Sequence, residues 1–307
     1  MNLFSSSEYD ELKQVILGTA TNAHWPTKCP VYRATEKTTR WKETPVPSGP
    51  VEQFVIDEAN EDLENFSHEL KLCGVEVFRP KDLDFASFDG MYNYCPRDRL
   101  LVIDDIVIDA PMKYPTRLRE LDALSHLIDN DIICPDSPDV MFDAANVCRL
   151  GYGNIIYLVS ESGNYAGGKW LQKTLGSRYN VEIVDNVYNG VHIDSTIVPI
   201  QPGLAIINGD RVLPGNNLPK HLENWDLIHM HDHYVREQNF HEYPYASKFI
   251  GLNLLSVNPE KVICDSRQTV LRNELEDHGI ETIGVHLRHS RTLGGGHHCT
   301  TLDVCRK

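Results

Sequence analysis

The 307-residue chain has a formal net charge of −15, with 41% hydrophobic and 24% charged residues. This balance is close to that of an average soluble globular protein, so it argues against a disordered chain and against a membrane protein. The excess of acidic side chains argues against a nucleic-acid partner, because binding a phosphate backbone takes clustered lysines and arginines.

Short segments with a high content of β-branched residues recur along the whole chain and predict strands. In chain order they are QVILG, VEVFRP, LLVIDDIVI, NIIYLV, YNVEIV, TIVPI, LAIING, KVICD and ETIGVHL. Amphipathic stretches between them predict helices over Val51–Cys73, Tyr165–Leu175 and Ser266–His278, the last ending before Gly279. The alternation predicts an α/β fold and suggests internal structural repetition.

Several motifs are missing from the sequence. No linker rich in proline, glycine or serine divides it, so we expect one domain over residues 1–307. No glycine-rich nucleotide loop is present. There is no membrane-length apolar run and no secretion signal at the start, and the eight cysteines lack metal-site or CxxC spacing. We therefore expect a cytoplasmic protein without a disulfide framework.

The string LGGGHHCTTLD, from Leu293 to Asp303, is the most specific in the chain. Three consecutive glycines disfavour helix and strand, because glycine loses the most backbone entropy on ordering. They permit positive φ and close approach of a ligand, and exposed N–H groups there lower the pKa of a thiol. The string predicts a nucleophile loop around Cys299; a flexible C-terminal tail is the alternative.

A cysteine nucleophile needs a proton shuttle, and His192 in NGVHIDST is the best-placed histidine. In an extended segment, His192 and Asp194 point to the same side, where they suit a cationic ligand. The alternative is a pair of ordinary surface polar residues.

Three further charged residues adjoin apolar segments: Asp98, Asp143 and Arg211. Buried carboxylates are costly without a cation or donor, so the simplest explanation for Asp98 is a salt bridge with Arg97 or Arg99. Arg211 either holds a carboxylate through two parallel hydrogen bonds or is a turn residue in solvent.

With these residues the chain resembles the arginine:glycine amidinotransferase family of the guanidine-modifying superfamily. The similarity runs through SEYDELKQVILGTATNA, PRDRLLVIDDIVIDAPM, FDAAN, NYAGGKWLQ, VHIDST and LGGGHHCTTLDVCR. It implies a five-bladed α/β propeller of ββαβ modules, the pentein fold, with the active site in the central channel.

The matching motifs also imply roles for individual residues. Cys299 would be the nucleophile, His192 the general acid and base, and Asp143 the carboxylate partner of His192. The residues expected to bind arginine are Asp98, Asp194, Arg211 and Ser247.

The implied reaction moves the amidino group of L-arginine to an amine acceptor through a covalent amidino-cysteine and releases ornithine. Glycine, lysine and natural-product amines are the candidate acceptors, and neither a cofactor nor a metal is needed. The alternatives are a deiminase-like hydrolase that gives citrulline and a non-catalytic propeller that binds arginine. We leave open whether two copies form a homodimer.

The chain departs from the family in two places. Asn146 follows FDAA where the family usually has an acid, and the chain ends soon after the cysteine loop, which would thin that wall of the site or leave it to a partner subunit. His229, His231 and His233 alternate as on one face of a strand, which favours an acceptor-side or surface loop over a metal site.

Overall fold

The architecture is built from repeated small sheets. A computed structural model describes the whole chain except residues 2, 35–45, 214, 216 and 242–243. Within the described residues, the strands form five three-stranded sheets and one two-stranded pair. In each three-stranded sheet the first strand is antiparallel to the second, and the second is parallel to the third.

Four of these sheets follow one another along the chain. They are β5 (Leu100–Ile103), β6 (Ile106–Asp109) and β7 (Ile132–Ile133); β8 (Val147–Gly151), β9 (Asn154–Leu158) and β10 (Asn180–Val184); β11 (Ile197–Gln201), β12 (Leu204–Asn208) and β13 (Asp226–Met230); and β14 (Leu255–Asn258), β15 (Lys261–Asp265) and β16 (Glu281–Val285).

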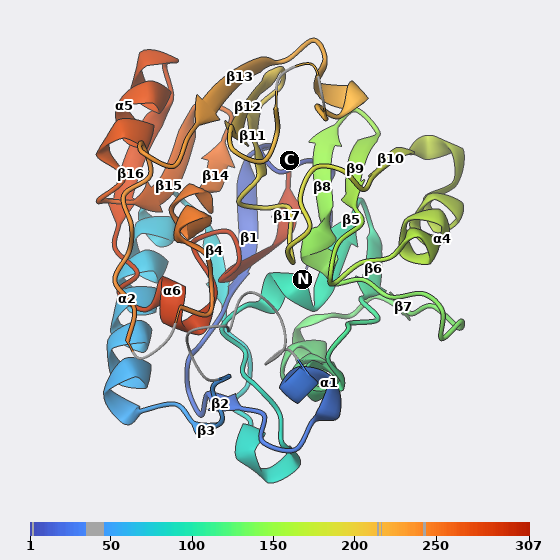
Figure 1. Cartoon of the computed structure of the whole chain (residues 1–307), viewed down its shortest axis with the longest axis vertical. Helices are drawn as coiled ribbons and strands as arrows, with labels where there is room; N and C mark the ends of the chain where they lie inside the picture. The colour runs from blue at the N-terminus through green and yellow to red at the C-terminus, as the bar shows by residue number, and fades with distance from the viewer. Residues whose placement is uncertain (2, 35–45, 214, 216, 242–243) are drawn as a thin grey trace.

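The fifth sheet joins the two ends of the chain. It consists of β17 (Thr301–Arg306), β1 (Leu12–Leu17) and β4 (Glu76–Phe78), and Figure 1 shows red β17 beside blue β1 at the centre of the molecule. The remaining pair is β2 (His24–Trp25) with β3 (Gly49–Pro50). Pairing of β17 with β1 closes the ring of sheets.

Helical segments connect the second and third strands of the sheets. They are α2 (Gln53–Leu72), α3 (Leu121–Leu124), a 3₁₀ turn at Lys220–Leu222, α4 (Tyr165–Leu175) and α5 (Thr269–Asp277). Two other short helices are α1 (Pro30–Arg33) and α6 (Ser290–Leu293). Each sheet with its connection is a ββαβ module, so the expected five-bladed pentein propeller is confirmed. Among the described residues, no helix combines the length and apolar character needed to cross a membrane.

Local sequence explains where the helices lie. The predicted range of α4 is the observed one, and the side chain of Asn164 caps its first turn by accepting from the Gly167 N–H at 2.9 Å. Helix α5 stops before Gly279, whose φ of +79° is unfavourable for other residues. Helix α2 buries one face, with Val55, Ala59, Leu63, Phe66 and Leu70 at helical spacing.

The predicted strands are present, but several observed strands were missed. LLVIDDIVI is a hairpin of two strands, β5 and β6, and the strands β2, β3, β7, β8, β13, β14 and β17 were not predicted. Strands β8 and β17 are buried throughout although they carry Arg149, Asp303 and Arg306. Their charged residues hide the apolar pattern on which strand prediction depends.

Candidate active site

The segments just before the first strands of the five sheets converge. Asp98 precedes β5, Asp143 lies before β8, Asp194 before β11, Asn253 before β14 and Cys299 before β17. All but Asn253 line a central cavity of about 570 Å³. The fivefold repetition of the module therefore brings together residues that are far apart in the sequence.

Cys299 is buried within this cavity wall, 3% exposed. Its Sγ is 3.1 Å from Asp194 Oδ2, and its backbone N–H donates to Asn253 Oδ1 at 2.9 Å. A hydrogen bond to Cys95, burial and the charge of Asp194 raise the pKa of the Cys299 thiol well above its usual value. The expected lowering of this pKa by loop N–H groups is therefore wrong for the substrate-free protein, because acceptors and carboxylates surround the sulfur.

The three glycines before Cys299 serve contacts within the protein. Gly294 has a φ of +82°. A Cβ atom on Gly295 would lie 2.5 Å from Cys95 Sγ, and one on Gly296 would lie 2.8 Å from the Asn253 side chain. The glycines thus let the nucleophile loop pass close to its neighbours, which accounts for the string.

His192 lies between two carboxylates. Its Nε2 is 3.0 Å from Asp143 Oδ2, and its Nδ1 is 3.5 Å from Asp98 Oδ1. Burial lowers the pKa of His192, but the charge of Asp98 and the hydrogen bond and charge of Asp143 outweigh it and raise the pKa to about 9. His192 is thus an imidazolium at neutral pH. Residues 191–196 form bends and turns, so the expected extended segment is wrong, yet His192 and Asp194 do line one cavity.

The salt-bridge partner of Asp98 is a residue that the sequence analysis missed. Arg117 Nη1 is 2.7 Å from Asp98 Oδ2 and the same guanidinium binds Glu120 through two hydrogen bonds, at 2.8 and 2.9 Å. The suggested pairing of Asp98 with Arg97 or Arg99 is wrong, since those arginines face other carboxylates. The partner of Asp98 is distant in the sequence, so the residues next to Asp98 do not indicate this pairing.

Two carboxylate oxygens at the cavity accept no hydrogen bond from the described residues. Within the described part of the chain, the buried atoms Asp98 Oδ1 and Asp143 Oδ1 have no hydrogen-bond partner. A buried acceptor without a donor is costly, and a planar cation with several N–H groups is the ligand that would satisfy both.

Arg211 lies against the cavity wall. Its Nη1 donates to Thr196 Oγ1 at 2.7 Å and its Nη2 to Ser247 Oγ at 3.2 Å, while its guanidinium stacks 3.7 Å from the centre of the Tyr188 ring. Ser247 and Tyr188 line the cavity. The structure therefore places all seven predicted site residues in or beside one cavity.

Two asparagines that support the site were not predicted as functional. Asn253 receives the Cys299 N–H and donates to Asp194 O at 3.1 Å. Asn146, at the family's acidic position, donates to Leu158 O at 2.9 Å and Ser160 Oγ at 2.8 Å. Asn146 therefore anchors the segment after β9. The position of Asn253 just before β14 could have indicated its role at the site, but strand β14 was not predicted either.

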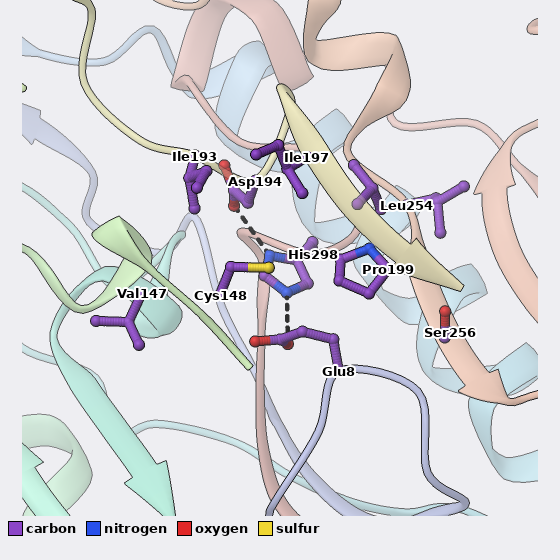
Figure 2. Close-up of a pocket in the computed structure, with 11 residues that line it drawn as sticks. Glu8, Val147, Cys148, Ile193, Asp194, Ile197, Pro199, Leu254, Ser256 and His298 are labelled. Atoms are coloured by element: carbon purple, nitrogen blue, oxygen red, sulfur yellow. Dashed lines mark hydrogen bonds and ion pairs between the residues drawn. The ribbon is translucent and has the colours of Figure 1, made fainter. Parts of the chain in front are cut away.

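Behind the cavity wall, Asp194 is held from a second direction. Figure 2 shows the His298 ring between Asp194 and Glu8, with one ring nitrogen toward each carboxylate. Burial raises the pKa of Asp194, but hydrogen bonds and charge from His298, with contributions from His192 and Cys299, hold it well below its usual range. Asp194 is therefore an anion in the absence of substrate.

The histidines 229, 231 and 233 do not share a strand. Only His229 lies in β13, whereas His231 and His233 follow it, with ring centroids 6.0 Å apart and stacked. His231 Nδ1 faces Asp210 Oδ1 at 2.9 Å. The expected alternation along one strand face is wrong, because the strand ends at Met230.

Comparisons with known proteins agree with this arrangement. The chain is 37% identical to inosamine-phosphate amidinotransferase 1 of Streptomyces glaucescens, over 98% of this chain and 95% of that protein. It is 29% identical to the mitochondrial glycine amidinotransferase of Xenopus tropicalis, over 99% of this chain and 82% of that protein. No protein-family model matches.

The fold is also found in a solved relative. The structure of inosamine-phosphate amidinotransferase from Streptomyces griseus superposes with a TM-score of 0.90 and 34% identity, covering 99% of this chain and 97% of that one. Fold and cavity thus define a guanidine-modifying enzyme of the pentein class. The chain belongs to the amidinotransferase family, whose reaction moves an amidino group from arginine to an amine acceptor. The resemblance stated from the sequence is confirmed.

Proposed function

We propose that amidino transfer proceeds through a covalent bond to Cys299. The observation that carries this proposal is a buried thiol 3.1 Å from Asp194 in a cavity that also presents one oxygen each of Asp98 and Asp143 that accepts no hydrogen bond from the described residues. An arginine guanidinium entering there would meet anionic carboxylates next to a sulfur nucleophile.

The substrate would itself activate the thiol. In the substrate-free site, Cys95, burial and the charge of Asp194 keep Cys299 protonated. A bound guanidinium brings positive charge to Asp98 and Asp194, which relieves the repulsion between these carboxylates and a thiolate. The thiolate then forms only when arginine is present, and the proton that Cys299 gives up passes to water, because His192 already carries its own.

His192 would move the protons. The thiolate attacks the guanidinium carbon, and the imidazolium of His192 protonates the departing nitrogen, so the C–N bond breaks and ornithine leaves. Neutral His192 then takes a proton from the acceptor amine, which attacks the amidino carbon and releases the thiolate. Asp143, 3.0 Å from Nε2, would hold the ring throughout. Arg211 and Ser247 would bind the carboxylate of arginine.

For the acceptor, we propose an aminocyclitol amine. The supporting fact is that identity is higher to inosamine-phosphate amidinotransferase, 37%, than to glycine amidinotransferase, 29%, with nearly the whole relative covered. Incubation with arginine and a panel of inosamine phosphate, glycine and lysine would test this. Turnover fastest with glycine or lysine would contradict the aminocyclitol assignment.

The decisive experiment on the covalent mechanism uses arginine without acceptor. We expect about one equivalent of ornithine per enzyme and the mass of one amidino group on the protein, which an amine then removes with renewed turnover. Sustained citrulline production without an adduct would identify a hydrolase, and tight binding without ornithine would identify a binding protein.

We further propose that the whole chain acts as one catalytic domain in the cytoplasm. Every three-stranded sheet contributes a residue to the cavity or to the Cys299 loop. All eight cysteines are free thiols, which is typical of proteins in a reducing compartment.

A further inference from the structure

The residue before the nucleophile has an environment that the reaction scheme does not explain. His298 is buried, 8% exposed, and it lies outside the lining of the central cavity, so it does not meet substrate. Its Nδ1 is 2.9 Å from Asp194 Oδ2 and its Nε2 is 3.1 Å from Glu8 Oε2. Asp194 Oδ2 is also the atom that faces Cys299 Sγ.

The two contacts fix the state of the ring. A carboxylate only accepts hydrogen bonds, so both bonds form together only when each nitrogen of His298 carries a proton. The carboxylate of Glu8 cannot turn away, because Arg149 holds both of its oxygens, at 2.9 and 2.8 Å. The anchored carboxylate of Glu8 therefore orients the His298 ring, whose other nitrogen faces Asp194.

The space behind the ring is small. Figure 2 shows His298 among Glu8, Cys148, Ile193, Pro199 and Leu254. The cavity that these residues line has a volume of only about 10 Å³. That volume holds no ligand and at most one water molecule. The ring thus has no route to substrate except through Asp194.

We propose that His298 is a positioning residue, which holds Asp194 ionised and oriented for the guanidinium of the substrate and is itself oriented by Glu8. This inference rests on the proposed role of Asp194 in binding arginine. Without His298, Asp194 would lose a hydrogen-bond donor and a nearby positive charge at a buried site, where a carboxylate ionises less readily. A protonated or rotated Asp194 would no longer favour a cation.

The neighbouring histidine offers a matched control. His297 is equally buried, but its Nε2 is 3.1 Å from the Val285 carbonyl and its ring packs against Phe66. Burial lowers the pKa of His297 to about 4, so the ring is neutral. A His297→Gln variant changes the same loop and leaves the Glu8–His298–Asp194 chain intact.

The test compares arginine with citrulline, which replaces the guanidinium by a neutral ureido group. Both affinities are measured by calorimetry in a Cys299→Ala background, with and without His298→Gln. We expect His298→Gln to weaken arginine binding about 10- to 100-fold, the loss typical of a hydrogen bond to a charged group, and citrulline binding less than about threefold. His297→Gln should leave the ratio of the two affinities unchanged.

Equal weakening of both ligands, or no weakening of arginine, would overturn the proposal. If His298→Gln does not fold, Glu8→Gln is measured in the same way, because this variant keeps an acceptor for Nε2 and removes the charge. An unchanged ratio of arginine to citrulline affinity in Glu8→Gln would then overturn the proposal. Adduct formation by the wild-type enzyme with arginine alone tests the proposed function separately.

Discussion

Two groups of charged residues adjoin the Cys299 loop and differ in how their charges are satisfied. Behind the loop, the ionic cluster of Glu8, Arg97, Arg149, Asp303 and Arg306 is closely paired, for example Arg149 Nη2 with Asp303 Oδ2 at 2.7 Å and Arg306 Nε with the same oxygen at 2.6 Å. In the central cavity, Asp98 Oδ1 and Asp143 Oδ1 accept no hydrogen bond from the described residues, although His192 Nδ1 lies 3.5 Å from Asp98 Oδ1.

This difference separates structure from function. The arginines of the ionic cluster tie together β8, β17 and the 3₁₀ turn Pro96–Asp98, so removal of one charge leaves the others uncompensated in the interior. In the cavity, Asp98 is paired with Arg117 and Asp143 with His192, but each of the two carboxylates keeps one oxygen that accepts no hydrogen bond from the described residues and that a cationic substrate would complete. Substitutions in the two groups should therefore affect different quantities.

The largest expected effect is that of Cys299→Ala. Loss of the nucleophile should lower ornithine release at least about 10⁵-fold and abolish the amidino adduct, while arginine still binds. The matched control is Cys148→Ala, since Cys148 is equally buried but lines the small cavity beside His298 instead of the central cavity. Mass spectrometry and ornithine release are the measurements; an adduct that persists in Cys299→Ala would disprove the nucleophile assignment.

Asp143→Asn should slow adduct formation about 10²- to 10⁴-fold, the usual range for general acid–base catalysis. The pKa of His192 should fall from about 9, because a hydrogen bond to a carboxylate is lost, and the alkaline limb of the rate profile should move to lower pH. An unchanged limb would contradict this role. Asp139→Asn, on the exposed part of the same loop, is the control.

The same pKa shift makes a prediction for stability. A His192 pKa raised from 6.5 to about 9 stabilises the fold fully below pH 6.5, and this contribution is lost as the pH rises through about 9. Wild type and Asp143→Asn should therefore differ more in urea unfolding at pH 6 than at pH 10. A larger difference at pH 10 would contradict the assignment.

In the ionic cluster, Arg149→Met should destabilise the fold by about 3–5 kcal/mol, because Glu8 and Asp303 lose a buried partner. Chemical unfolding followed by circular dichroism measures this. Arg178→Met, which removes an exposed arginine 3.7 Å from Asp104, should change stability by less than about 1 kcal/mol. Equal effects of the two variants would show that the ionic cluster does not bear on stability.

The sequence predicted the fold class, three helices and the candidate residues, because motif and periodicity are local signals. The sequence did not predict the side-chain contacts that form only when the sheets close into a ring. These are the contacts of Asp98 with Arg117, Cys299 with Asn253, and Asp194 with His298. These partners are 19, 46 and 104 residues apart. Strands β8 and β17 were not predicted, because arginine and aspartate are residue types that usually lie on the surface. In this protein the ionic cluster pairs them in the interior.

The smallest expected effect concerns Cys95, the thiol that contacts Cys299 from the side of Gly295. Its hydrogen bond is the largest contribution that raises the pKa of Cys299, because it stabilises the protonated sulfur. Cys95→Ala should therefore lower that pKa and speed alkylation of Cys299 by iodoacetamide at pH 8 several-fold, roughly up to tenfold. Peptide mapping isolates Cys299 from the other cysteines, and Cys264→Ala, a buried thiol in β15, should leave its rate unchanged. Slower alkylation in Cys95→Ala would mean that Cys95 favours the thiolate, and the site would then hold its nucleophile charged before arginine arrives.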